Sequence, residues 1–298
     1  MYPLHIIQPS ELLHPADGTL PDFAPYTYKF LAQGDSWFSI GAVPPTGTTS
    51  IIMEMCLSAP DCAVNCAHPG FQLRRMVSAV RDPAFTQLLV GNQAWRWDGI
   101  LMSAGGNDLI DAIQVMPNYG NNHPQEGQPI PKSLRILLRS DEWTPTAGPA
   151  RYLSDLGWAA FSNYIKALVD ELQQLRDSSH SLSKEVPLFL HCYDYLVPRN
   201  APASLNVGPW LYPALDAYGV PPEDWKAVGV EVIIRFQSLL KSIKVPNLHI
   251  VNTPGTLTAA LPGSKGESND WVNEIHPTRG GYQRLSAVYG AAVDALFP

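Results

Sequence analysis

Residues 28–37 read Tyr-Lys-Phe-Leu-Ala-Gln-Gly-Asp-Ser-Trp, an apolar run that ends in a Gly-Asp-Ser turn. The apolar run predicts a strand over residues 27–36, and the glycine predicts a tight turn at its end. In open α/β folds the carboxyl ends of the strands form the edge at which ligands bind. We therefore expect the Ser36 hydroxyl to be presented at that edge of a sheet.

Further apolar runs alternate with segments of helical spacing along the rest of the chain. The patterns predict strands at 51–56, 63–65, 97–104, 186–193 and 247–251. They predict helices at 71–80, 83–90, 109–115, 152–176, 225–243 and 279–296. Strands that alternate with helices indicate an α/β fold, with a parallel sheet covered by helices on both faces.

The chain reads as one main domain with an extension and two excursions. Residues 1–26 are rich in proline and are expected to wrap the surface as a coil, before a single domain over residues 27–298. The insertions at 118–149 and 194–224 are irregular and leave the sheet where substrate would sit; a further loop is expected at 37–50. Loops at this edge usually shape specificity. Their aromatic residues either line a pocket or anchor the loops to the body; they include Trp143, Tyr193, Tyr195, Trp210 and Tyr212.

Composition excludes several classes of function. The 298 residues have a formal net charge of −7, which gives no electrostatic support to nucleic-acid binding. No apolar run is long enough to span a bilayer. The N-terminus lacks the basic and apolar regions of a Sec signal peptide, so a cytoplasmic location is the default expectation. Nothing in the sequence indicates the oligomeric state.

The four cysteines suggest a zinc site only weakly. Cys62 and Cys66 are four residues apart, Cys56 precedes them, and His68 offers a fourth ligand. However, the segment around Cys62 resembles the end of a strand more than a zinc knuckle. We expect these three residues, like Cys192, to be small buried or disulfide-capable side chains.

Two polar turns follow Ser36, and together they supply the groups that serine chemistry needs. A serine hydroxyl becomes nucleophilic when an imidazole takes its proton, and the developing oxyanion needs donors. His276, in an Ile-His-Pro turn before a helix, is the candidate base. Asn107, in a Gly-Gly-Asn-Asp turn, offers a side-chain donor, and Asp108 is expected to cap the next helix. Gly70 precedes another predicted helix, where its N–H could approach a substrate. Each motif taken alone is also typical of an ordinary turn.

The ordered set resembles the SGNH (GDSL) hydrolase family. The resemblance implies Ser36 as the nucleophile, with Gly70, Asn107 and the Ser36 N–H as the oxyanion hole and His276 as the base. It extends over residues 28–296 in topology, although the motifs cover few positions. The family fold is a flavodoxin-like three-layer α/β/α sandwich of about five parallel strands, in agreement with the pattern above.

The chain departs from the family at the acid. The family's Asp, three residues before the histidine, is Asn273 here. Asp270, six residues before His276, is our preferred acid, because the flanking residues of Glu274, which is also close, could direct its side chain away. An amide oxygen can orient an imidazole without a charge, so Asn273 stays open as the partner of His276. A Ser-His dyad, in which a backbone carbonyl orients the histidine, is a third possibility.

These observations predict an esterase or lipase-like hydrolase of carboxylic esters that works through an acyl-enzyme on Ser36, with no metal or organic cofactor. A carbohydrate O-deacetylase or an acyltransferase would use the same residues, and the motifs do not separate them. A non-catalytic binding module on the same fold is a third reading, which the asparagine at the acid position keeps open.

Overall fold

Six parallel strands form the central sheet of the computed structural model, which describes residues 1–39, 49–78, 80–204 and 206–298. Their order is β2-β5-β3-β6-β7-β8. Their bounds are β2 His5–Ile7, β3 Lys29–Gly34, β5 Cys62–Asn65, β6 Gly99–Ser103, β7 Leu188–His191 and β8 Leu248–Val251. A separate antiparallel pair joins β1 (Tyr2–Pro3) to β4 (Cys56–Leu57).

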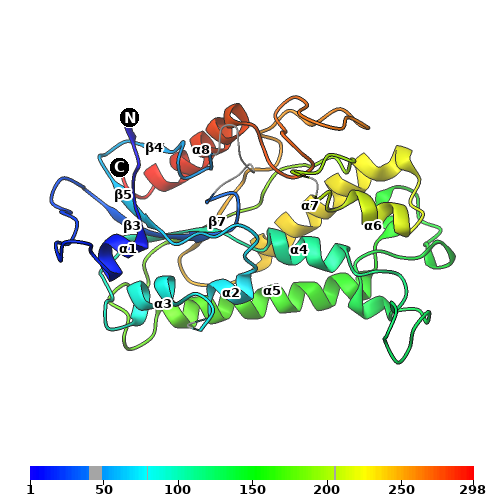
Figure 1. Cartoon of the computed structure of the whole chain (residues 1–298), viewed down its shortest axis with the longest axis horizontal. Coiled ribbons are helices and arrows are strands. Elements are labelled where there is room, and N and C mark those ends of the chain that lie inside the picture. The colour runs from blue at the N-terminus through cyan, green and yellow to red at the C-terminus, as the bar shows by residue number, and fades with distance from the viewer. Residues whose placement is uncertain (40–48, 79, 205) are drawn as a thin grey trace.

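Helices cover both faces of this sheet. Figure 1 shows α8 on one side and α2, α3 and α5 on the other, with both chain termini at the same end of the molecule. This arrangement confirms the predicted α/β sandwich. The helices are α1 Pro9–Leu13, α2 Leu73–Met76, α3 Pro83–Val90, α4 Gly106–Ile113, α5 Asp155–Arg176, α6 Tyr212–Ala217, α7 Trp225–Ser242 and α8 Arg279–Asp294.

A buried tyrosine fixes α8 to the sheet. The Tyr289 hydroxyl accepts the Met102 N–H at 3.0 Å and donates to the Phe189 carbonyl at 3.0 Å. It therefore joins the two central strands β6 and β7 through one side chain that is fully buried. The loop that carries His276 leads directly into α8, so this anchor also steadies the base.

The amino-terminal segment is the largest departure from the predicted fold. Residues 1–26 are not only a surface coil, because β2 pairs with β5 and extends the sheet from five strands to six, and α1 follows. A three-residue strand is too short to leave a periodic pattern. It forms because β5 presents unpaired backbone groups at its open edge.

Three smaller predictions are also corrected. Residues 51–54 form turns rather than a strand, although Ile51 and Ile52 are buried. The helix expected at 71–80 is only α2, and residue 79 lies outside the described part, as do residues 40–48 of the loop expected at 37–50. Helix α4 begins at Gly106, three residues early, because Gly105 at φ +91° takes the N-cap position.

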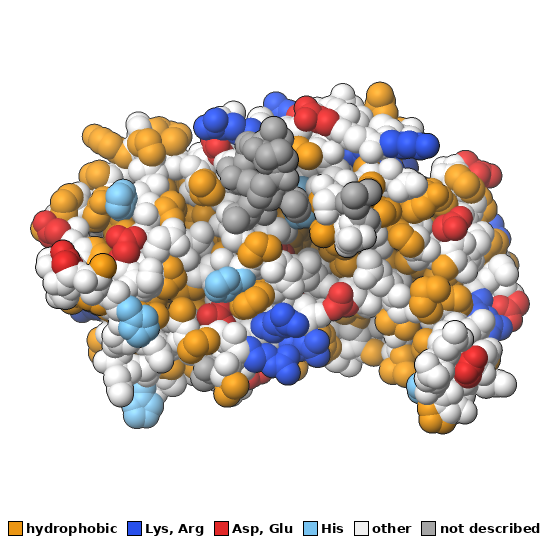
Figure 2. Space-filling view, viewed as in Figure 1, with side chains coloured by type: hydrophobic (Ala, Val, Ile, Leu, Met, Phe, Trp, Pro, Cys, Tyr) orange, Lys and Arg blue, Asp and Glu red, His pale blue; other side chains and the backbone are white. Residues whose placement is uncertain are grey.

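The visible surface is mixed in character. Figure 2 shows apolar side chains scattered over this face among charged side chains of both signs. Within the described residues, no helix is both long and apolar enough to cross a membrane.

Candidate active site

Ser36 lies on a tight turn at the carboxyl end of β3, as the sequence predicts. Gly34 is required there because a Cβ would lie 2.9 Å from the Cβ atoms of both Phe38 and Ser103. The Asp35 N–H donates to the Ser103 carbonyl at 3.0 Å, which ties the turn to β6. The turn closes when the Phe38 N–H donates to the Asp35 carbonyl. Ser36 is left half-buried at the edge of the sheet.

His276 meets Ser36 from the loop before α8. Its Nε2 lies 2.8 Å from the Ser36 Oγ, although 240 residues separate the two in the chain. The imidazole is 5% exposed, and burial lowers its pKa to about 4. A neutral imidazole in this position can accept the serine proton. The structure thus brings together the predicted nucleophile and the predicted base.

The other ring nitrogen of His276 faces Asn273. The Asn273 Oδ1 lies 3.1 Å from His276 Nδ1 and also accepts the backbone N–H groups of Ile275 (3.1 Å) and His276 (2.9 Å). Two backbone donors fix the amide with its oxygen toward the ring. Nδ1 must then hold the ring proton, and Nε2 is left to accept from Ser36. Asn273 therefore sets the tautomer that a general base needs.

Asp270 does not occupy the predicted acid position. Its Oδ2 accepts the Thr258 N–H at 2.7 Å, and its Oδ1 pairs with Arg284 on α8. Both carboxylate oxygens are thus engaged away from His276, and Asn273 holds the ring instead. The prediction of Asp270 as the acid was wrong, because the conformation of the loop before α8, rather than distance in the sequence, decides which side chain faces the imidazole.

Glu274 has a structural task that the sequence did not reveal. Its buried carboxylate accepts four backbone N–H groups of the second insertion: those of Arg199 (3.1 Å), Leu211 (2.9 Å), Tyr212 (2.8 Å) and Trp210. It therefore clamps the insertion to the loop that carries the base. The Trp210 ring packs against His276 with centroids 5.4 Å apart. No local pattern marks this role, because the donors are backbone groups more than 60 residues away.

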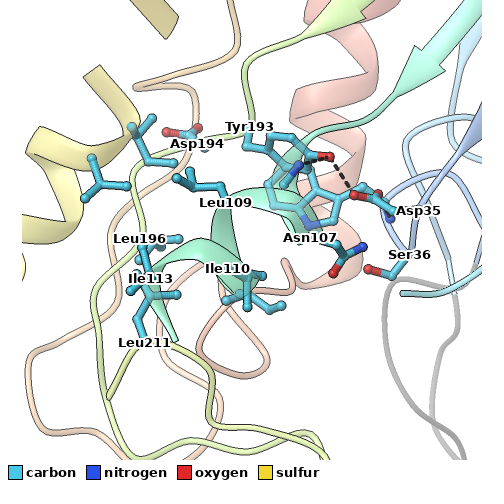
Figure 3. A pocket seen from close by; sticks show the side chains of 15 residues that line it. Asp35, Ser36, Asn107, Leu109, Ile110, Ile113, Tyr193, Asp194, Leu196 and Leu211 are labelled. Carbon is cyan, nitrogen blue, oxygen red and sulfur yellow. Dashed lines mark hydrogen bonds between the residues drawn. The ribbon is translucent and has the colours of Figure 1, made fainter. Parts of the chain in front are cut away.

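Asn107 lies beside Ser36, at the start of α4. Both residues line one pocket, and Figure 3 shows the Asn107 amide next to the serine hydroxyl. One N–H of the amide donates to the Phe71 carbonyl at 3.1 Å, which fixes the side chain. Its second N–H can serve a ligand. Asp108 falls within the first turn of α4, where its carboxylate accepts the Leu73 N–H at 2.8 Å.

Gly70 lies in the turn between β5 and α2 but not in the lining of this pocket. Its φ of +74° is left-handed, so glycine is favoured there. It precedes Phe71, whose carbonyl holds Asn107. The structure thus places Gly70 in the same turn as an anchor of Asn107.

A second serine, histidine and aspartate set lies beneath the turn, in the sheet. The Ser103 Oγ lies 2.8 Å from both Asp35 Oδ1 and His191 Nε2. His191 Nδ1 accepts the Tyr193 N–H at 3.1 Å, so its proton is on Nε2 and is donated to Ser103. Ser103 then gives its own proton to Asp35. This order is the reverse of nucleophile activation, and Ser103 and His191 are fully buried.

Tyr193 connects this network to α4. Its hydroxyl donates to Asp35 Oδ2 at 2.5 Å and accepts the Gly106 N–H at 3.1 Å (Figure 3). Tyr193 thereby holds Asp35 and Gly106, which directly precede Ser36 and Asn107 in the chain. Burial raises the pKa of Asp35 to about 6 against the hydrogen bonds that lower it. Sequence reasoning placed Tyr193 only among candidate pocket aromatics.

The pocket beside Ser36 is mainly aliphatic, although Trp37 and Tyr193 also line it. The second insertion contributes to it as predicted, whereas the first insertion supplies none of its lining residues. Of the five aromatic candidates only Tyr193 lines it; Trp143, for example, packs on Tyr152 and donates to the Leu138 carbonyl. The aliphatic lining consists of Leu109, Ile110, Ile113, Leu196, Leu211, Val232, Ile233 and Ile275.

The cysteines are all free thiols, three of them buried, and Cys56 is half-buried. Burial raises the pKa of Cys62 to about 12, so this thiol stays protonated at neutral pH. In the described ranges, no group of three or more His, Cys, Asp or Glu side chains is arranged to hold a metal ion.

Comparison with known proteins gives similarity in structure only. No protein-family model matches the chain, and no curated protein matches its sequence. The structural neighbours are SGNH/GDSL-like esterases and lipases. An extracellular lipase of Streptomyces rimosus has 13% identity and a TM-score of 0.48, covering 90% of this chain and 99% of its own. An aryl esterase of M. smegmatis has 12% identity and a TM-score of 0.47, over 91% and 100%. A putative GDSL-like lipase of Parabacteroides merdae has 11% identity and a TM-score of 0.45, over 91% and 97%. Likeness at these values describes the fold alone.

Proposed function

We propose that the chain is an SGNH-type serine hydrolase that cleaves carboxylic esters through an acyl-enzyme on Ser36. The proposal rests above all on one observation, the 2.8 Å contact between Ser36 Oγ and His276 Nε2. It gains support from Asn273, which holds the ring in the tautomer that accepts a proton. A nucleophile, a base and an orienting group in hydrogen-bond sequence are what nucleophilic catalysis requires.

The reaction has two halves. In the first, His276 Nε2 takes the Ser36 proton as Oγ attacks the ester carbonyl, and the amide of Asn107 donates to the oxyanion. The imidazolium then protonates the leaving alcohol as the tetrahedral intermediate collapses to the acyl-enzyme. In the second half, His276 deprotonates a water that attacks the acyl carbonyl, and the returned proton frees Ser36. The backbone N–H of Ser36 is the further oxyanion donor of this proposal, whereas Gly70, which the sequence predicted for the same role, lies outside the lining of the pocket.

Ser36 is preferred to Ser103 as the nucleophile for two physical reasons. Ser36 lines the pocket, whereas Ser103 is fully buried in the sheet. In addition, the Ser103 hydroxyl accepts a hydrogen bond from His191 and donates one to Asp35. His191 therefore does not act as a base toward it. A buried, satisfied network of this kind mainly fixes the geometry of its surroundings.

The proposal is tested on the wild-type protein with p-nitrophenyl esters and a fluorophosphonate probe. We expect hydrolysis of at least one ester and covalent labelling, with the label on the peptide that contains Ser36 when the digest is mapped by mass spectrometry. Label on the Ser103 peptide would instead assign the chemistry to the buried network. Absence of both labelling and hydrolysis would favour the binding module.

The pH profile reports on the base. Only neutral His276 can accept the serine proton, and burial lowers its pKa to about 4. We therefore expect kcat/KM to stay flat down to about pH 5 and to fall roughly tenfold per pH unit below about pH 4. A limb near pH 6 would instead match Asp35, whose pKa is about 6. In that case, removal of the limb in Asp35→Asn would identify the group.

A further inference from the structure

The pocket beside Ser36 offers little to a polar ligand. Ser36 and Asn107 lie at one side of it, Asp35 and Tyr193 also line it but hydrogen-bond to each other, and most of the other lining side chains are aliphatic. Asp194 also lines it, but its carboxylate already accepts three backbone N–H groups, from Tyr195 and Gly255 at 2.6 Å and from Leu257 at 2.8 Å. Sugar hydroxyls placed here would lose water without gaining partners, which is unfavourable. The lining suits an apolar chain.

The position of the base shows which part of an ester this pocket receives. His276 must protonate the leaving alcohol, yet it does not line the pocket. Asn107, which would hold the carbonyl oxygen, does line it. Figure 3 shows Ser36 and Asn107 at one side and Ile113, Leu196 and Leu211 at the other. A chain attached to the carbonyl carbon can extend from Ser36 past Asn107 toward these residues, while the alcohol leaves near His276.

We propose that this pocket is an acyl-chain site that takes an aliphatic chain, so that the preferred substrates are esters of aliphatic acids longer than acetic acid rather than acetyl esters. This inference rests on the proposed function. Each methylene moved from water into an apolar site favours binding about fourfold. For the wild-type protein, we therefore expect kcat/KM to rise by roughly fourfold for each methylene added to the acyl chain, until the pocket is full.

The experiment compares p-nitrophenyl acetate with p-nitrophenyl octanoate in two variants of α7. Ile233 lines the pocket and is 2% exposed, whereas its neighbour Ile234 is 40% exposed. Ile233→Phe narrows the pocket and is expected to lower the octanoate-to-acetate ratio of kcat/KM by about tenfold or more. Ile234→Phe makes the same change outside the pocket and is expected to leave the ratio within about twofold.

The ratio of two substrates on one preparation does not depend on the fraction of active protein. If Ile233→Phe does not fold at all, Ile110→Trp at the half-buried mouth of the pocket replaces it, with the same expected fall in the ratio. A second pair of substrates, ethyl octanoate and octyl acetate, separates the two ends of the ester. Preference for ethyl octanoate supports the acyl assignment, and preference for octyl acetate overturns it.

Failure of this inference differs from failure of the proposed function. A wild-type protein that labels at Ser36 but prefers acetate, or whose ratio is unchanged when the pocket is narrowed, remains a serine hydrolase without this acyl site. A protein that neither labels nor hydrolyses any ester overturns both.

Discussion

Ser36→Ala is expected to lower kcat for ester hydrolysis by about 10⁴-fold or more and to abolish fluorophosphonate labelling. The variant removes the atom that forms the acyl-enzyme, and Ser103, which contacts a histidine within the described residues, receives a proton from that histidine instead of giving one up. The side chain is half-buried, and among the described residues its hydroxyl is hydrogen-bonded only to His276. The free energy of unfolding should therefore change by only about 1 kcal/mol. Steady-state kinetics and thermal unfolding measure the two effects.

Ser103→Ala is the matched control, because it makes the same change in the other serine and histidine pair. We expect activity within about tenfold of wild type and labelling at Ser36. Stability should fall, by about 1–3 kcal/mol, because Asp35 and His191 lose a buried partner. If labelling instead survived in Ser36→Ala and vanished in Ser103→Ala, the nucleophile would be Ser103 and the mechanism above would be wrong.

Local signals account for the parts of the site that the sequence predicted. Ser36 and Asn107 follow strands, and His276 precedes a helix, so each lies at a boundary that turn residues and apolar runs mark. Parallel strands then bring their carboxyl ends to one edge without further information. Gly34 and Ser103 are paired across β3 and β6, for example, although 69 positions separate them.

The parts that the sequence missed depend on distant partners. The choice between Asp270 and Asn273 was decided by Thr258 and Arg284, which capture the carboxylate. Strand β2 forms only because an edge is available to it. The aliphatic pocket is likewise formed by side chains from α4, α7 and the second insertion, and no short window of sequence contains that combination. Aromatic residues were the more visible candidates, but most of them anchor loops.

Asn273→Ala is expected to lower kcat by about 10²- to 10⁴-fold with little change in KM, because His276 loses the acceptor that keeps its proton on Nδ1. The ring can then adopt the other tautomer, which donates to Ser36 instead of accepting from it. Asp270→Asn is the control: it removes the carboxylate that we first expected to act and should leave kcat within about threefold. A large loss in the control with an unchanged rate in Asn273→Ala would restore Asp270 as the orienting group.

Asn273→Asp separates orientation from charge at the same position. The carboxylate keeps an acceptor for Nδ1, and the Asn273 Nδ2 that it replaces is buried with no hydrogen-bond partner in the described residues. A negative charge beside the imidazole favours its protonated form and raises the pKa of His276 from about 4. The acid limb of kcat/KM should therefore move to higher pH, while activity at neutral pH is retained. If the acid limb of kcat/KM stayed at the same pH, the group that titrates there would not be His276, because the new carboxylate lies directly beside the ring.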